Sequence, residues 1–101
     1  MNWITVLYNS NQNYIVQEQA ILDVVNSVIL RFKTVKLTTK PKLVFDNEHT
    51  NVQLGLEIKL KAKDKSYYSV IKDLSNQLEE AIKQLIDVKP KNIQIAITEF
   101  L

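Results

Sequence analysis

The chain has 101 residues, 46% of them hydrophobic, and a formal net charge of +2. This length fits one domain with its own apolar core, and so small a net charge does not by itself select a partner. The absence of cysteine excludes disulfides and thiolate metal sites. The first residues contain neither a basic segment nor a long apolar run, and no stretch of about 20 apolar residues follows. We therefore expect a single domain over residues 1–101, and these features are compatible with a cytoplasmic location.

The N-terminal third predicts a strand followed by a helix. Residues 4–8 are β-like, residues 9–13 form a polar loop and residues 14–16 extend again. Residues 18–32 repeat apolar side chains at the spacing of a helix, while Leu30 lies off that stripe. The stripe consists of Ile21, Val24, Val25, Val28 and Phe32, widened by Leu22 and Ile29.

The central third predicts an antiparallel hairpin with one long arm. Lys40 and Pro41 break the helical pattern, because a residue before proline is pushed to extended geometry. Residues 42–45 predict a strand and residues 46–51 a polar turn. Residues 52–63 then alternate apolar and polar side chains without a slip, which is typical of a long strand with one buried face. Two strands joined by a short polar loop favour antiparallel pairing.

The last third predicts a long amphipathic helix and a final strand. Residues 64–66 end the long strand, and Ser66 can cap the helix that follows. Pro90 prevents the helix from continuing, and residues 93–98 alternate again. The apolar face of this helix comprises Tyr67, Val70, Ile71, Leu74, Leu78, Ala81, Ile82 and Leu85.

These elements follow the order β-α-β-β-α-β, which predicts an α+β fold. Both predicted helices and the later strands have one apolar face. The economical packing therefore places the two helices on one face of a small mixed β-sheet. A right-handed crossover through the second helix makes the last strand parallel to the long one.

No catalytic, metal-binding or cofactor-binding motif is present in the sequence. His49 is the only histidine and lies in a polar turn, where we expect it to be solvated. Glu79 and Glu80 are helix neighbours, whose side chains point about 100° apart and do not converge as an acid–base pair. No serine lies in a G-x-S-x-G elbow. We therefore expect no enzyme, no cofactor and no small-molecule substrate.

The single glycine and the single tryptophan each predict local structure. Gly55 is the only glycine, which excludes P-loops and dinucleotide fingerprints. Within a strand, a lone glycine indicates close approach of another backbone or side chain. Trp3 is the only tryptophan, and we expect it to anchor the first strand in the core, with a partner contact as the alternative.

Nucleic-acid binding is the alternative function that the charge distribution leaves open. One run of basic residues lies between Asp23 and Asp46, where the chain has no acidic residue. A second run lies at the end of the long strand. Either run has the charge of a phosphate-facing patch. The chain lacks the GXXG loop of KH domains, however, and the polar side of residues 52–63 lacks the aromatic side chains of an RRM, so we expect no tight nucleic-acid binding. The runs are Arg31, Lys33, Lys36, Lys40 and Lys42, and then Lys59, Lys61, Lys63 and Lys65.

The polar side of the predicted sheet is a candidate self-association surface. If Leu54, Leu56 and Ile58 face the helices, strand alternation turns Gly55 outward. A flat and partly apolar patch without long polar side chains suits a packing interface, and a merely solvated sheet is the alternative. We therefore expect a homo-oligomer. The patch comprises Val44, Gly55, Ala96 and Thr98, with Lys59 and Lys61 on its rim.

Taken together, residues 14–100 resemble the alkaline-shock-protein family of bacterial envelope stress proteins, also called YloU-like. The resemblance rests on a short strand feeding a helix, a hairpin with one long strand, and an amphipathic helix before an alternating strand. These segments read YIVQEQAILDVVNSVI, KPKLVFDNEHTNVQLGLEIKLKA and YYSVIKDLSNQLEEAIKQLIDVKPKNIQIAITEF. Many family members have glycine after the first helix and on both sides of the second, where this chain reads FKTV, KDKS and LIDV. Residues 1–13 look like an N-terminal addition to the family pattern.

The resemblance implies a non-enzymatic cytoplasmic protein of a low-GC bacterium that takes part in cell-envelope homeostasis. It also implies action through self-association and through protein partners. A membrane-associated partner would hold the chain at the periphery of the membrane. The family has no catalytic residue to carry over.

Overall fold

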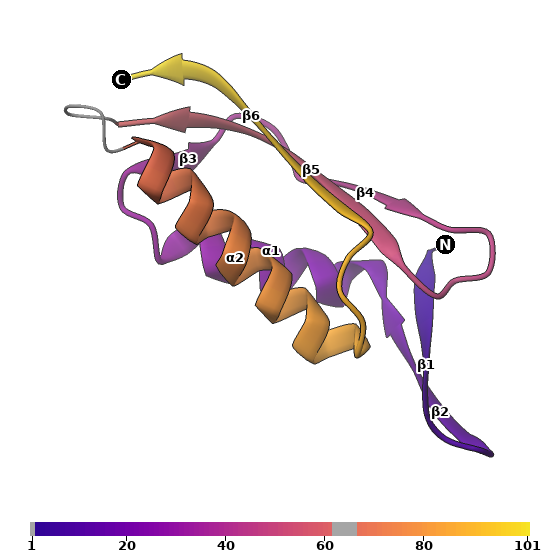
Figure 1. Ribbon diagram of the computed structural model, residues 1–101. Helices are drawn as coiled ribbons and strands as arrows, with labels where there is room; N and C mark the ends of the chain where they lie inside the picture. Colours follow the sequence, from indigo (N-terminus) through magenta and orange to yellow (C-terminus); the bar gives the residue numbers. More distant parts are fainter. Residues whose placement is uncertain (1, 62–66) are drawn as a thin grey trace.

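The structure, a computed structural model, describes residues 2–61 and 67–101. It is an α+β fold with two helices and two sheets, drawn in Figure 1. The molecule is elongated, with extents of 52 × 22 × 18 Å. The elements in chain order are β1 (Trp3–Asn9), β2 (Gln12–Gln17), α1 (Glu18–Leu30), β3 (Val35–Leu37), β4 (Lys42–Phe45), β5 (Val52–Leu60), α2 (Tyr67–Ile86) and β6 (Asn92–Phe100).

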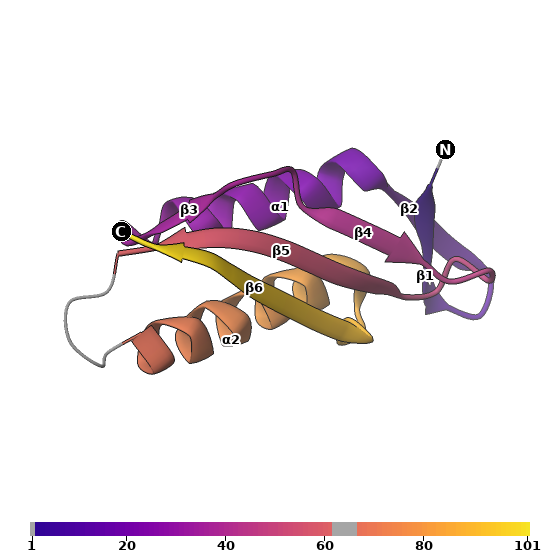
Figure 2. The same ribbon diagram turned by 90° about the horizontal axis from the view of Figure 1, so that it is seen from above.

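The larger sheet is built around β5, the long alternating strand. Along one side of β5, the short strands β3 and β4 pair antiparallel, one after the other. Along its other side, β6 pairs parallel to it (Figure 2). The predicted β4–β5 hairpin and the predicted parallel pairing of the last strand are therefore both confirmed.

The hydrophobic core lies between this sheet and the two helices. The alternate residues Leu54, Leu56 and Ile58 of β5 are at most 3% exposed, which confirms the face predicted to be buried. Helix α2 lies on the β6 side of the sheet and α1 on the β3–β4 side (Figure 2). The helices contribute Ile21, Val25, Val28 and Ile29 from α1, and Leu74, Leu78, Ile82 and Ile86 from α2.

The second sheet is an N-terminal hairpin formed by β1 and β2, which projects from the body of the molecule (Figure 1). The prediction of a polar loop over residues 9–13 is wrong in its extent, because β2 already begins at Gln12. Its first residues are polar and exposed, so no apolar alternation marked them as a strand. At the base of the hairpin, Ile4, Val6 and Val16 are buried, and so the segment that looked like an addition reaches the core.

The predicted element order is therefore incomplete. Two strands precede α1 instead of one, and β3 was not predicted. With only three residues, β3 is too short to display a period of its own. It is held by pairing with the far end of β5, where Leu37 lies opposite Ile58.

Element boundaries follow the predictions closely where the periodicity is strong. Helix α2 spans Tyr67–Ile86, and β6 extends the predicted strand at both ends. Helix α1 ends at Leu30 rather than at residue 32, and β5 ends at Leu60. The predicted strand residues 62–63, the strand end over residues 64–66 and the Ser66 cap lie outside the described residues.

The glycine-free stretches that flank the helices differ in backbone conformation. After α2, Asp87 takes a positive φ of 67° and donates its N–H to the Lys83 carbonyl at 2.8 Å, a geometry that glycine usually supplies. After α1, none of residues 31–35 takes a positive φ, so no glycine is required there. The stretch before α2 includes residues 63–66, which are outside the described part. In the described part of the chain, neither helix is long and apolar enough to span a membrane.

Candidate interaction surface

The face of the larger sheet that points away from both helices is called the open face here. Its side chains follow from the strand register, which aligns residues of β4 or β3, β5 and β6 in four rows. The exposed Val44 and the half-buried Gly55 belong to it, as the alternation predicted. The rows are Val44–Gln53–Asn92, Lys42–Gly55–Gln94, Glu57–Ala96 and Lys36–Lys59–Glu99.

Thr98 does not occupy the position that strict alternation gives it. The register shifts between β5 and β6, so that Ile97 lies opposite Ile58 and Glu99 opposite Lys59. Thr98 is the extra residue of this bulge, and its hydroxyl donates a hydrogen bond to the Ile58 carbonyl at 3.1 Å. It stays exposed, but as part of the bulge rather than as the next member of a flat row.

The two predicted rim lysines differ in their surroundings. Lys59 lies on the open face and forms an ion pair with Glu99 at 3.2 Å. Both side chains are about half exposed, so this pair stabilises the fold by no more than about 1 kcal/mol. Lys61 follows the end of β5 and is exposed, and its backbone N–H donates to the Thr34 carbonyl at 2.8 Å. Lys36 lies opposite Lys59, so both basic runs of the sequence reach the open face.

A hollow of about 180 Å³ lies on the open face at Gly55. A Cβ atom placed on Gly55 would meet the Lys42 Cβ at 3.9 Å and the Lys42 carbonyl oxygen at 4.0 Å, both ordinary contact distances. The prediction that this glycine marks a close approach is therefore wrong within the described residues. The lining residues are Thr39, Lys40, Lys42, Gly55, Leu56, Glu57, Gln94 and Ala96.

The turn between β4 and β5 is held by the carboxylate of Asp46. The Thr50 hydroxyl donates to it, and the backbone N–H groups of Asn51 and Thr50 donate at 3.0 Å and 2.7 Å. Because these donors, the Thr50 hydroxyl above all, favour the charged carboxylate, they lower the pKa of Asp46 to about 2. The turn thereby fixes β4 beside β5 and places Val44 on the open face.

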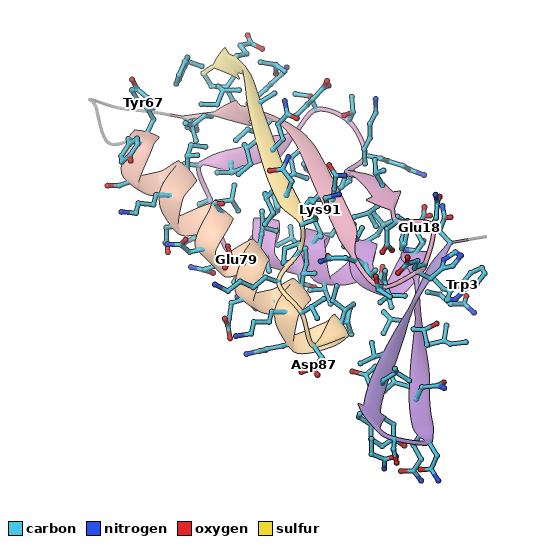
Figure 3. All side chains as sticks on the ribbon, turned by 45° about the vertical axis from the view of Figure 1, so that its right-hand side comes forward. Trp3, Glu18, Tyr67, Glu79, Asp87 and Lys91 are labelled. Atoms are coloured by element: carbon cyan, nitrogen blue, oxygen red, sulfur yellow. The ribbon has the colours of Figure 1, made fainter. Side chains whose placement is uncertain are left out.

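His49, predicted to be a solvated turn residue, is part of an internal contact. Its ring stacks on Trp3 with centroids 3.7 Å apart, and its Nδ1 lies 3.1 Å from the Trp3 carbonyl oxygen. His49 is only partly exposed and takes a φ of 58°. The prediction that Trp3 anchors the first strand in the core is therefore wrong: Trp3 is only partly buried and packs against the β4–β5 turn at the base of the hairpin (Figure 3).

The two acidic neighbours Glu79 and Glu80 have separate hydrogen-bond and ion-pair partners. Glu79 forms an ion pair with Lys89 at 3.5 Å, while Glu80 accepts a hydrogen bond from the Gln84 amide at 3.4 Å. Among the described residues, no group of three or more histidine or acidic side chains is arranged to hold a metal ion. The residues that the structure describes also include no buried polar or charged side chain.

Several exposed apolar side chains were not singled out by the sequence analysis. On the N-terminal hairpin, Leu7 and Ile15 are 68% and 59% exposed. At the end of β6, Phe100 and Leu101 are 55% and 52% exposed. The alternation of residues 93–98 was the signal that pointed toward β6, but it gave no information on which strands would lie at an edge.

Comparison of the chain with models of protein families, with characterised proteins and with solved structures finds no match. A functional proposal therefore rests on the geometry of the open face and its surroundings.

Proposed function

We propose that this chain is a non-enzymatic protein-interaction module that self-associates through its sheet. The hollow at Gly55 is the observation that carries the proposal. It opens on the exposed side of the central strand, and a side chain at that position would fit without disturbing the fold. The space is thus left for an atom from outside the chain.

The hollow itself is lined mostly by polar side chains, including Lys42 and Glu57, while apolar and small residues lie in neighbouring rows of the open face. Val44 is 59% exposed, and the small residues Gly55 and Ala96 lie in neighbouring rows. An exposed aliphatic side chain beside small residues lets a partner approach the backbone closely and excludes water from the contact. The charged residues Lys59 and Glu99 lie toward one end of this face, in the manner of a polar rim.

The partner that we propose for this face is a second copy of the chain, because identical surfaces meet naturally across a two-fold axis. A further protein partner, in keeping with the resemblance to alkaline-shock proteins, forms part of the proposal. That partner would be membrane-associated and would hold the chain in the cytoplasm near the envelope.

Binding to an anionic partner such as nucleic acid is the second candidate, and one observation favours it. Lys36 and Lys59 lie opposite each other, so the two basic runs meet on one face. Glu57 and Glu99 lie on that face as well, and its four rows contain no aromatic side chain for base stacking. The first proposal therefore predicts at most weak nucleic-acid binding that disappears with added salt. A sub-micromolar, sequence-dependent affinity at about physiological salt would favour the second candidate over the first.

The first proposal is tested by placing a lysine on the open face. We expect Val44→Lys and Ala96→Lys to keep the circular-dichroism spectrum and cooperative melting, but to shift the light-scattering mass toward that of a monomer. Asn76→Lys adds the same charge on an exposed position of α2 and should leave the mass unchanged. Retention of the oligomeric mass by both open-face variants would overturn the proposal.

A further inference from the structure

An apolar groove of about 480 Å³ lies between helix α1 and strand β3, and it shares no lining residue with the hollow at Gly55. Leu30, at the end of α1, is 83% exposed, the highest value among the large apolar side chains that the structure describes. This leucine lies off the apolar stripe of the helix, as the sequence predicted, and it lines the groove. A partner that covered the groove would therefore bury it. The apolar lining consists of Ile29, Leu30, Phe32, Val35 and Leu37.

Strand β3 presents backbone groups beside this groove. Among the described residues its strand partner is β5 alone, and Figure 2 shows β3 at the border of the larger sheet. The Thr38 N–H donates to the Glu57 carbonyl of β5 at 2.9 Å. Because backbone groups alternate sides along a strand, those of Leu37 and Val35 point away from β5. The Val35 N–H donates to the Phe32 carbonyl, which leaves the Leu37 N–H and two carbonyls along this edge.

The charged residues of the groove lining are both positive. They are Lys33 and Lys36, which are exposed. Within the described part of the chain, neither of them forms an ion pair. Between Asp23 and Asp46 the chain has five basic residues and no acidic one. An apolar groove with unpaired positive charges at its border is complementary to an apolar segment that also contains acidic side chains.

We propose that this groove binds an extended acidic segment of a partner protein, paired edge to edge with β3. A strand at this edge places alternate side chains on the helix side of the sheet, where Leu30 and Phe32 line the groove. The remaining side chains lie on the side of the open face, where Lys36 lies. The segment that fits therefore alternates apolar and acidic residues. Lipids and nucleic acids also carry negative charge, but neither presents the alternating backbone donors and acceptors of a strand.

The inference names the chemistry of the further protein partner, and it rests on that part of the proposed function. Self-association uses Val44, Gly55 and Ala96, none of which lines the groove. Lys36 lies in the row of the open face farthest from the row of Val44. The groove can therefore be occupied while the open faces of two copies are in contact.

Peptide binding tests the groove, and the probe is a short fluorescent peptide in which valine and glutamate alternate. Fluorescence anisotropy at low salt should show saturable binding that weakens with added salt. Leu30→Ala and Lys33→Glu should each weaken this binding by about tenfold or more. Both side chains are exposed, so the circular-dichroism spectrum should not change. Lys72→Glu makes the same charge change on an exposed position of α2 and should leave the affinity nearly unchanged.

The backbone of the peptide provides a separate test of the strand pairing. A strand contacts its neighbour through the backbone groups of every second residue. Methylation of the valine nitrogens alone, or of the glutamate nitrogens alone, removes one set of donors and keeps every side chain. One of these two methylated peptides should lose binding while the other retains it. Equal affinities of the two would overturn the pairing with β3.

The outcomes separate this inference from the proposed self-association. Absence of saturable binding, or binding that neither Leu30→Ala nor Lys33→Glu weakens, would overturn the groove and leave self-association standing. A light-scattering mass that falls in Leu30→Ala would assign the groove to a second copy and overturn the partner. Binding to phosphatidylglycerol vesicles in place of the peptide would overturn it in favour of a lipid. A monomeric mass with intact peptide binding would support the groove and overturn self-association alone.

Discussion

Trp3 stacks face to face on His49, with ring centroids 3.7 Å apart and an angle of 4° between the ring planes. The Thr5 N–H also donates to the His49 carbonyl at 2.8 Å, so one turn residue holds the first strand by ring and by backbone. The contact spans 46 residues of sequence and joins the N-terminal hairpin to the β4–β5 turn.

This stack predicts an energetic coupling between the two residues. Trp3→Ala and His49→Ala should each lower the free energy of unfolding, and the double variant should lose less than the sum by about 0.5–1.5 kcal/mol. Chemical denaturation of the four proteins gives the coupling. His49→Asn is a useful control, because asparagine tolerates the φ of 58° but cannot stack. Strictly additive losses would contradict the role assigned to the stack.

The buried face of α2 predicts a contrast between adjacent residues. Leu78 is fully buried, so Leu78→Ala should cost about 2–5 kcal/mol of stability. Gln77 lies on the outer side, where it accepts a hydrogen bond from Arg31 at 3.3 Å, and Gln77→Ala should cost less than about 1 kcal/mol. Thermal melts of both variants compare the two losses of stability. Equal decreases in melting temperature would refute the assigned face.

The Asp46 carboxylate predicts a defined pH dependence. Its pKa is lowered from 3.8 to about 2 in the folded chain, so its contribution to stability is complete above 3.8 and is lost as the pH falls through about 2. Asp46→Asn should therefore be less stable than the unmodified chain at neutral pH, and the difference should shrink over that acid range. An NMR titration of the carboxyl carbon should give a midpoint near 2, and a midpoint near 3.8 would show that the turn hydrogen bonds do not form.

Gly55 predicts opposite effects on stability and on assembly. Glycine within a strand costs about 0.5–1 kcal/mol relative to alanine, and the site has room for a Cβ atom, so Gly55→Ala should stabilise the fold slightly. Gly55→Leu should fill the hollow, keep the fold and reduce the oligomeric mass. Denaturation and light scattering measure the two effects separately. A marked destabilisation by Gly55→Ala would reveal an internal need for glycine that the geometry does not show.

Much of the fold follows from periodicity that can be read in the sequence. Helix α2 was predicted from end to end because its apolar face is regular and Pro90 lies just beyond it. Alternation within β4, β5 and β6 predicts that Val44, Gly55 and Ala96 share the open face, and the strand register agrees. Both cases depend on neighbours in the chain, where the period is a direct consequence of backbone geometry.

The features that were missed depend on contacts between distant segments. The three-residue strand β3 exists because β5 offers it a partner, and the bulge at Thr98 arises from the register of two strands. The role of His49 depends on Trp3, 46 residues away. No local pattern encodes such relationships, and the same limit applies to the outer edge of β3, since the strand order is a property of the whole sheet.

The mass of the unmodified chain in solution tests the central claim of self-association most directly. Light scattering over a series of concentrations should show at least twice the monomer mass of 11.7 kDa at the highest concentration, falling toward the monomer on dilution. A mass of 11.7 kDa at every concentration would contradict the account.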